Sequence, residues 1–125
     1  AKTNHYVETI FGRRCNIRGI NDKNFAVRGF AERQSINAPI QGTAADIIKL
    51  AMIKVSRFRN SNELLKTKLL LQVHDELVFE SSEKKLDNIK NFIIKIMMNA
   101  HTPLVKLSVP LEVSCGVGNN WEEAH

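Results

Sequence analysis

Apolar residues recur at helical spacing in two long segments of the chain. The first apolar face follows Thr43 and comprises Ala44, Ile47, Ile48, Ala51, Val55 and Phe58. It predicts a helix that begins at Thr43, where Asp46 completes an approximate capping box, and that ends near Asn60. The second face comprises Leu86, Ile89, Ile93, Ile96, Met97 and Ala100. It predicts a helix that Ser82 caps and Pro103 stops.

Shorter apolar runs predict strands. Residues 6–17 are typical of a hairpin with its turn at Gly12, and residues 67–73 and 77–80 of a second hairpin. Residues 111–117 alternate with period two, which predicts a final strand. The order of these elements predicts an α+β fold, in which amphipathic helices pack on an antiparallel sheet made of the second hairpin and the C-terminal strand.

The segment between the first hairpin and Thr43 has a less regular pattern. A short helix over residues 24–36 is expected there. Pro39 and Gly42, in the sequence APIQG, should break whatever precedes them, because proline cannot donate a backbone hydrogen bond within a helix.

The composition is ordinary for a soluble globular protein. The chain has 125 residues, of which 43% are hydrophobic and 25% are charged, and its length suits one domain or a piece of a larger one. No apolar stretch approaches the roughly 20 residues that a membrane span needs, and the first ten residues hold no export signal. Cys15 and Cys115 fit free thiols in a reducing compartment. A cytoplasmic protein with no membrane partner is therefore expected.

The net charge of +5 is unevenly distributed along the chain. Residues 1–60 carry eleven Lys or Arg against four Asp or Glu, whereas residues 61–125 carry seven against nine. All seven arginines, which suit bidentate phosphate contacts, lie in the first part. A basic half joined to an acidic half fits a polyanion partner and a cation site, but it equally fits a solvated surface.

Two adjacent acids, Asp75 and Glu76, fall with His74 in the turn of the second predicted hairpin. A tight turn projects side chains from the edge of a sheet, where a hard cation such as Mg²⁺ could reach carboxylate oxygens. Two such ions about 4 Å apart stabilise the attacking and the leaving oxygen of a phosphoryl transfer. The alternatives are a simple polar turn and, for His74, a hydrogen-bonded structural residue.

Three polar donors, Arg33, Asn37 and Gln41, are spaced four residues apart. On a continuous helix they would share a face, which Pro39 should prevent beyond about residue 37. They could still converge on one groove, because Asn and Gln can donate to the minor-groove acceptors that every base pair presents. Helix capping and hydrogen bonding within loops are the alternative for all three.

Taken together, two stretches resemble the C-terminal part of family A DNA polymerases. They are NAPIQGTAADIIKLAMI, which begins at residue 37, and LQVHDELVFE, which begins at residue 71. YVETIFGRR, RGFAERQSIN and GVGNNWEEAH match the same pattern in the same order, so the resemblance covers essentially the whole chain. It implies a palm-like fold and template-directed nucleotidyl transfer in DNA replication and repair. It also implies two Mg²⁺ ions, with primer-template DNA and deoxynucleoside triphosphates as partners.

The resemblance implies a role for each candidate residue. Asp75 resembles the second catalytic aspartate, which is a metal ligand, and Glu76 resembles the neighbouring acid that supports the metal site. His74 is similar to a residue packed near the primer 3′ end. The remaining three are similar to contacts with the primer-template duplex: Arg33 and Gln41 near its junction, and Asn37 on the template side.

The resemblance also implies how the chain divides. Residues 1–38 would form the base of the fingers, and residues 39–125 the C-terminal part of the palm. Asn16 and Arg18 depart from the aromatic residue and the proline that are usual in the family, which leaves the shape of the first hairpin open.

Two parts of the family's catalytic apparatus are absent from the sequence: its first metal-binding aspartate and the fingers helix that holds the nucleotide. The chain is therefore expected to be a C-terminal fragment, inactive alone and catalytic only within its full-length parent. The bared edge of its sheet could pair with a second copy.

Two other classes of protein compete with this interpretation. A stand-alone basic module that binds nucleic acid without chemistry would gain nothing from two acids beside DNA. A small metal-dependent hydrolase would need further His or acid ligands, and the sequence offers none at a suitable spacing.

Overall fold

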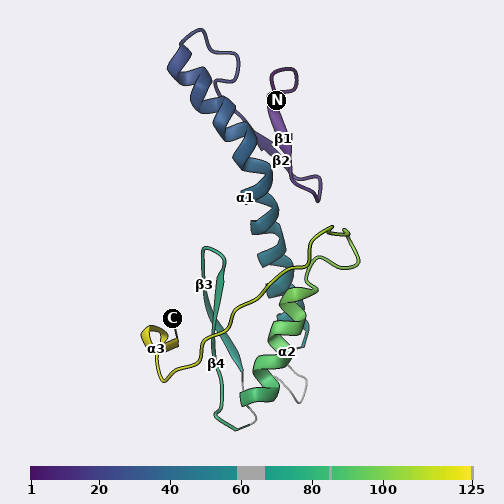
Figure 1. Ribbon diagram of the computed structural model, residues 1–125, viewed down its shortest axis with the longest axis vertical. Coiled ribbons are helices and arrows are strands. Elements are labelled where there is room, and N and C mark those ends of the chain that lie inside the picture. Colours follow the sequence, from purple (N-terminus) through teal and green to yellow (C-terminus); the bar gives the residue numbers. More distant parts are fainter. Residues whose placement is uncertain (59–66, 85, 125) are drawn as a thin grey trace. The chain divides into compact units, whose positions relative to one another are not determined.

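The computed structural model describes residues 1–58, 67–84 and 86–124 (Figure 1). Within these ranges its elements are, in chain order, β1 (Tyr6–Glu8), β2 (Arg14–Asn16), α1 (Phe25–Arg57), β3 (Lys68–Val73), β4 (Glu76–Glu80), α2 (Leu86–Met98) and α3 (Trp121–Ala124). The helices and antiparallel hairpins confirm the α+β prediction. Of the helices in the described ranges, none is both long and apolar enough to cross a membrane. The chain divides into two compact units, Ala1–Asp46 and Ile47–His125.

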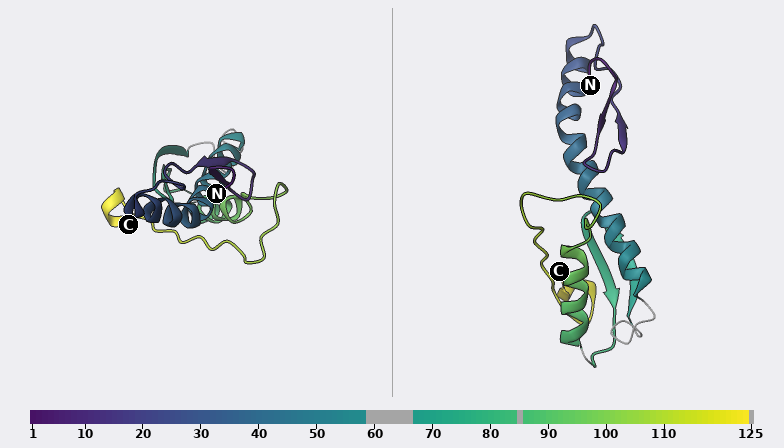
Figure 2. Two further views of the ribbon diagram at one scale, coloured as in Figure 1. Left: turned by 90° about the horizontal axis from the view of Figure 1, so that it is seen from above. Right: turned by 90° about the vertical axis from the view of Figure 1, so that its right-hand side faces the viewer.

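The first unit consists of the β1–β2 hairpin and the first part of α1, which lie side by side in both side views (Figures 1 and 2). The two strands pair with Val7 opposite Cys15, and Gly12 has a φ of 85° in the connecting turn, as the sequence predicted. The core of this unit is a cluster of Ile17, Ile20 and Ala31, against which Val7 and Ala38 pack. The hairpin is therefore fixed to one side of α1 by buried apolar contacts.

Helix α1 runs without interruption through Pro39 and Gly42, and it has 33 residues. The predictions of a short helix over residues 24–36, a break at Pro39 and a new helix at Thr43 are therefore wrong. A proline inside a helix removes the N–H that would bond the carbonyl of Ser35, at a cost of about 3 kcal/mol. The hairpin that packs on α1 supplies contacts that outweigh this local preference, as tertiary packing often does.

The capping box expected at Thr43 and Asp46 is also absent, because both residues lie inside α1. Their side chains bind the β1–β2 hairpin instead. Thr43 Oγ1 accepts a hydrogen bond from the backbone N–H of Ile10, and the Asp46 carboxylate accepts from Thr9 and Arg13. Residues chosen as local caps from the sequence are thus long-range anchors in the fold.

The second unit holds the β3–β4 hairpin, α2 and the end of α1. Strands β3 and β4 pair antiparallel with Val73 opposite Glu76, which confirms the second predicted hairpin. Val55 of α1 packs with Ile89 and Ile93 of α2, and these buried residues form the core of this unit. The surrounding partly buried residues are Phe79, Phe92, Ile96 and Met97. The apolar faces predicted for the two helices are therefore the faces that meet.

Three expectations for the second unit differ from the structure. Ser82 does not cap α2, which begins at Leu86; the Ser82 hydroxyl accepts from the backbone N–H of Lys84 in the preceding turn. Helix α2 ends at Met98, before Pro103 is reached. Residues 111–117 form no strand in the described part of the chain, because alternation gives a strand its two faces but not the neighbour that its backbone must bond.

The close contact between the hairpin and α1 predicts opposite effects of one substitution at two glycines of the same helix. A Cβ at Gly29 would meet its nearest neighbour, Arg33 Nη1, at 3.6 Å. Gly29→Ala should therefore raise the free energy of unfolding by about 0.5–1 kcal/mol, which is the usual gain of alanine over glycine in a helix.

A Cβ at Gly42 would lie 2.8 Å from Cγ2 of the buried Thr9 and 3.3 Å from Arg13 Nη2. Gly42→Ala should therefore lower the free energy of unfolding by about 1–3 kcal/mol, because the hairpin must shift to admit the methyl group. Chemical denaturation of the two variants beside the parent measures both effects. Stabilisation by Gly42→Ala would contradict the packing described.

Candidate functional site

The β3–β4 turn presents the two acids that the sequence singled out. Because Val73 pairs with Glu76, only His74 and Asp75 form the loop, and Glu76 is the first residue of β4. The sequence had placed Glu76 in the turn itself. His74 has a φ of 51°, in the left-handed region that few residues other than glycine adopt, although His is enriched there among them. Tight two-residue hairpin loops require a positive φ at this first position.

A side chain of β3 supports the loop. The Gln72 side-chain amide donates a hydrogen bond of 2.9 Å to the carbonyl oxygen of His74. This bond holds the peptide group that joins His74 to Asp75. It therefore helps to set the position of the Asp75 backbone, from which the carboxylate projects. Gln72 was not among the residues that the sequence singled out. Its only signal was a polar residue within an apolar strand, two positions before the turn.

Asp75 of this loop and Glu76 of β4 could supply part of a metal site. His74 and Asp75 are exposed, and Glu76 is half-buried. Among residues 1–58, 67–84 and 86–124, no group of three or more His, Cys, Asp or Glu side chains could hold a metal ion. Two carboxylates on adjacent residues nevertheless fit the hard-oxygen chemistry of Mg²⁺, which usually takes one or two protein carboxylates together with waters and substrate phosphates.

The polar donors Arg33, Asn37 and Gln41 all lie on α1, and all three are exposed. Because α1 is continuous through Pro39, their spacing of four residues places them along one face of the helix. Helix capping is not their role, since they lie well inside the helix. These three donors belong to the first unit, whereas His74, Asp75 and Glu76 belong to the second.

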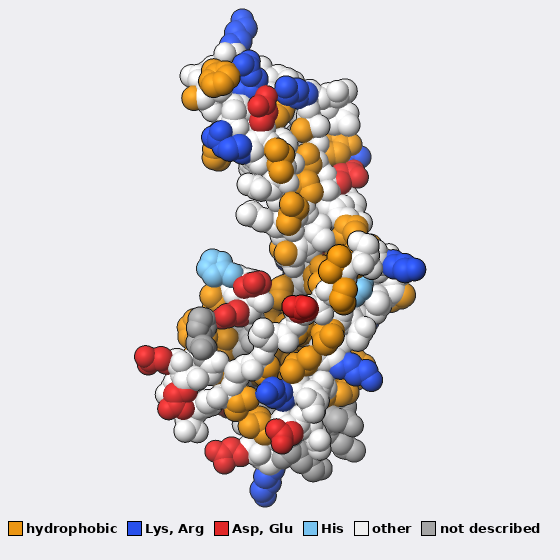
Figure 3. All heavy atoms as spheres, viewed as in Figure 1, with side chains coloured by type: hydrophobic (Ala, Val, Ile, Leu, Met, Phe, Trp, Pro, Cys, Tyr) orange, Lys and Arg blue, Asp and Glu red, His pale blue; other side chains and the backbone are white. Residues whose placement is uncertain are grey.

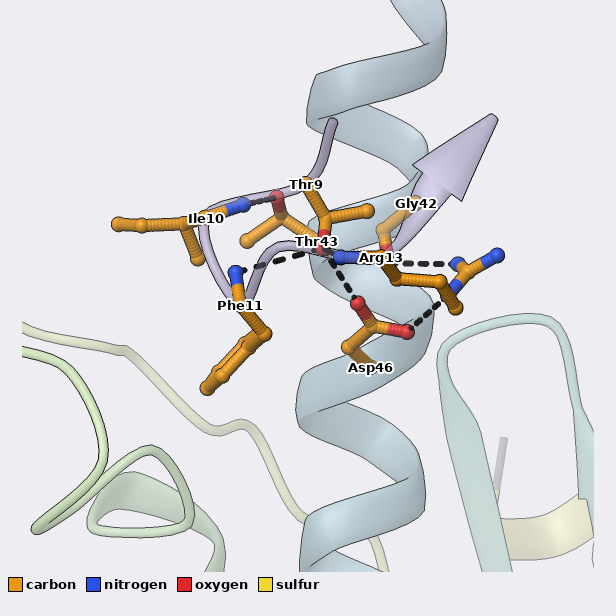
Figure 4. Close-up of polar contacts among 7 residues, drawn as sticks. All are labelled: Thr9, Ile10, Phe11, Arg13, Gly42, Thr43 and Asp46. Atoms are coloured by element: carbon orange, nitrogen blue, oxygen red, sulfur yellow. Dashed lines mark hydrogen bonds and ion pairs between the residues drawn. The ribbon is translucent and has the colours of Figure 1, made fainter. Parts of the chain in front are cut away.

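The opposite side of α1 binds the hairpin through Asp46 (Figure 4). Asp46 Oδ1 accepts from Arg13 Nε at 2.7 Å, and Asp46 Oδ2 accepts from Thr9 Oγ1 at 2.8 Å. Arg13 Nη2 also donates to the carbonyl oxygen of Gly42 at 3.3 Å. The Thr9 hydroxyl, in a residue only 5% exposed, additionally accepts from the backbone N–H groups of Phe11 and Arg13. Each of these polar groups therefore has a partner.

The ion pair at this contact is partly shielded from water, since the Asp46 side chain is 12% exposed and that of Arg13 is 47% exposed. The hydrogen bond from Arg13 to Asp46, followed by the charge of Asp46, raises the pKa of Arg13 above its ordinary value. Because its pKa is raised, Arg13 keeps its charge to a higher pH than an ordinary arginine, and it is charged at every pH at which the protein works. Titration of Arg13 therefore introduces no pH dependence near neutrality.

Cationic side chains are spread over the surface of the first unit (Figure 3). The exposed ones in this unit are Lys2, Arg13, Arg14, Arg18, Lys23 and Arg33. Some of them have partners within the chain: Arg14 lies over the Tyr6 ring at 4.5 Å and approaches Glu8 at 3.6 Å. The uneven charge seen in the sequence is thus displayed on the surface, where a polyanion could meet it.

Comparison with known proteins matches the chain to one family over nearly its whole length. The model of DNA polymerase family A matches residues 1–123. DNA polymerase I of Rhizobium leguminosarum is 46% identical over 126 residues, covering 100% of this chain and 12% of the relative. DNA polymerase I of Pseudomonas aeruginosa is 48% identical over 120 residues, covering 96% of this chain and 13% of the relative. The chain therefore spans only a small part of the length of the relatives that it matches.

A solved structure also resembles the chain, both in sequence and in fold. The POL domain of Pol1 from M. smegmatis, solved in complex with DNA primer-template and dNTP, superposes with a TM-score of 0.88 at 44% sequence identity. The match covers 99% of this chain and 21% of that one.

The bond between Gln72 and the loop predicts that removing its donor loosens the turn. Gln72→Leu and Gln72→Glu should each destabilise the loop by about 0.5–1.5 kcal/mol, because the carbonyl of His74 loses its partner. Faster hydrogen exchange of the Asp75 and Glu76 amides would report this change. Lys68→Gln, at the far end of the same strand, is the control and should leave those amides unaffected. Unchanged exchange in both Gln72 variants would show that the bond does not hold the loop.

Proposed function

Because the chain belongs to DNA polymerase family A, we propose that it supplies a duplex-binding helix and part of the metal site of a DNA-directed DNA polymerase. The observation that carries this proposal is the β3–β4 loop, in which a residue with positive φ and a bond from Gln72 hold Asp75 at the tip of the hairpin. Backbone strain of this kind is concentrated at functional sites.

Asp75 is the proposed metal ligand, and Glu76 the acid that supports the site beside it. Their oxygens match the preference of Mg²⁺, and ions bound there would stabilise charge on the attacking and leaving oxygens during nucleotidyl transfer. Since the described residues offer no third ligand nearby, this turn alone should hold such an ion weakly. The 125-residue chain by itself is therefore expected to be inactive.

The exposed face of α1 is the proposed contact with primer-template DNA. Arg33 and Gln41 would bind near the primer-template junction, Asn37 would bind on the template side, and His74 would lie near the primer 3′ end. Amide and guanidinium donors can reach minor-groove acceptors whose positions are shared by all correct base pairs, so they can test the geometry of a pair without reading its sequence. The arrangement of the three donors on one exposed helix face supports this role.

The proposed partners are primer-template DNA and a deoxynucleoside triphosphate, both of which the similar POL domain binds in its solved complex. Residues 1–38 are assigned to the base of the fingers and residues 39–125 to the palm, with α1 continuous across that boundary. The place of action would be the cytoplasm, where a bacterial chromosome lies. Self-association through a sheet edge is a further possibility, since β3 and β4 pair only with each other among the described residues.

The metal assignment predicts the loss of catalysis without the loss of DNA binding. In a full-length polymerase that contains this sequence, Asp75→Asn should reduce single-turnover nucleotide addition by about 10³-fold or more, because an amide cannot replace an anionic metal ligand. The dissociation constant for duplex DNA should change little. Glu80→Gln removes the same charge from the other end of β4 and serves as the control. Turnover close to that of the parent would refute the assignment of Asp75.

The duplex-binding face predicts weaker discrimination at the primer terminus. Gln41→Ala and Arg33→Ala should each slow extension from a matched primer, because each removes a contact that contributes roughly 1–3 kcal/mol. Extension from a mismatched primer should slow less. Lys23→Ala, which removes an exposed cation outside this face, should slow both reactions to the same small extent. Rates that fall equally on both primers in all three variants would mean that the face makes no contact specific to the primer terminus.

A further inference from the structure

Asp46 joins the β1–β2 hairpin to α1 five residues after the proposed duplex contact Gln41. We propose that Thr9, Arg13 and Asp46, here called the hairpin clamp, position Gln41 for the primer terminus. They would be positioning residues for the polymerase reaction, acting on DNA only through the helix that they hold. This inference rests on the proposed role of Gln41.

Gln41 lies between the proline of α1 and one of its glycines. Pro39, two residues before it, removes one backbone hydrogen bond of the helix, and Gly42, directly after it, is the residue with the least helical preference after proline. Proline and glycine are the usual places at which helices kink. Contacts from outside the helix would therefore stabilise the backbone around residue 41.

The hairpin clamp supplies that support on the C-terminal side of Gln41. Arg13 donates to the carbonyl oxygen of Gly42 at 3.3 Å and to Asp46 at 2.7 Å, so one guanidinium spans a full turn of the helix. Thr9 binds the second oxygen of Asp46 at 2.8 Å, and the hairpin backbone at Ile10 donates to the Thr43 hydroxyl at 3.1 Å. Backbone and side-chain atoms of α1 are thus held at three successive points.

The fit between the hairpin and α1 is close at the backbone. A Cβ on Gly42 would lie 2.8 Å from the Thr9 methyl group and 3.5 Å from Cys15 Sγ, so the hairpin occupies the space that a side chain would need. A contact this close fixes the position of the helix axis as well as that of a side chain. Movement of the hairpin would therefore move residue 42 and its neighbour.

The clamp and the proposed DNA contacts lie on opposite faces of α1. At about 100° of rotation per residue, Gln41 projects roughly 150° away from the mean direction of Gly42, Thr43 and Asp46. The exposure pattern agrees, because Gln41 is exposed whereas those three residues are half-buried. The clamp thus leaves the exposed face open and can influence it only through the backbone.

The test uses a full-length polymerase that contains this sequence, with Asp46→Asn, Gln41→Ala and the double variant. Extension rates from matched and mismatched primer ends and the melting temperature are measured for each. We expect Asp46→Asn to lower the matched-to-mismatched ratio at least threefold. In the Gln41→Ala background, it should lower that ratio no further. Its effect on the melting temperature should be the same in both backgrounds, because that effect does not pass through Gln41.

Glu32→Gln is the matched control. It also removes one negative charge from α1 and breaks an ion pair to the segment before β1, that of Lys2 and Glu32 at 3.2 Å, but it leaves the clamp intact. The matched-to-mismatched ratio should not change in this variant. If Asp46→Asn does not yield folded protein, Arg13→Lys replaces it with the same criteria, since lysine keeps the charge but cannot bond Gly42 and Asp46 together.

Three results would overturn the inference. If Asp46→Asn lowers the melting temperature but not the ratio, or if its effect on the ratio adds to that of Gln41→Ala, the clamp is structural only. The proposed function of Gln41 would stand in either case, provided that Gln41→Ala alone lowers the ratio. If Gln41→Ala alone leaves the ratio unchanged, the role of Gln41 and the inference built on it are both wrong.

Discussion

The first unit depends on the hydrogen bonds that the carboxylate of Asp46 accepts from the hairpin. This carboxylate receives a hydroxyl and a guanidinium from the hairpin at 2.8 and 2.7 Å, on a side chain that is 12% exposed. Bonds to a charged acceptor are about twice as strong as neutral ones, and shielding from water preserves that strength. The apolar cluster of Ile17, Ile20 and Ala31 brings the hairpin to α1, but contacts of this kind have no direction. The directed bonds to Asp46 set where along the helix the hairpin lies.

The two sets of candidate site residues are held by different physical means. The donors on α1 stand on a helix that is stabilised from its far side, so the exposed face itself need carry no structural contacts. The acids of the β3–β4 loop depend instead on local backbone geometry, namely the positive φ of His74 and the bond from Gln72. The proposed contacts on α1 therefore lie on a different face from the residues that bind the hairpin, whereas in the loop His74 both shapes the turn and belongs to the candidate site.

Much of this arrangement could be predicted from the sequence, where periodicity alone carries the information. Spacing predicted the apolar faces that meet at Val55, Ile89 and Ile93. Alternation and turn residues predicted both hairpins. The continuity of α1 was not predicted, because local rules weigh Pro39 without the hairpin that compensates for it. The strand expected at residues 111–117 failed for the opposite reason: its pattern was right, but a strand also needs a neighbour. The candidate site residues were proposed from motifs, whereas Gln72 and the partners of Asp46 could be found only in three dimensions.

The length of the β3–β4 loop has a consequence for the interior of the second unit. Side chains alternate between the two faces of a strand, so a slip of one residue in the pairing would exchange the faces of all of β4. Phe79, which packs against the cluster of Val55, Ile89 and Ile93, would then turn toward solvent. An inserted or deleted residue beside Asp75 that shifted this pairing would therefore damage the hydrophobic core as well as the turn. The packing of the second unit therefore constrains the number of residues in the loop, independently of any function of the turn.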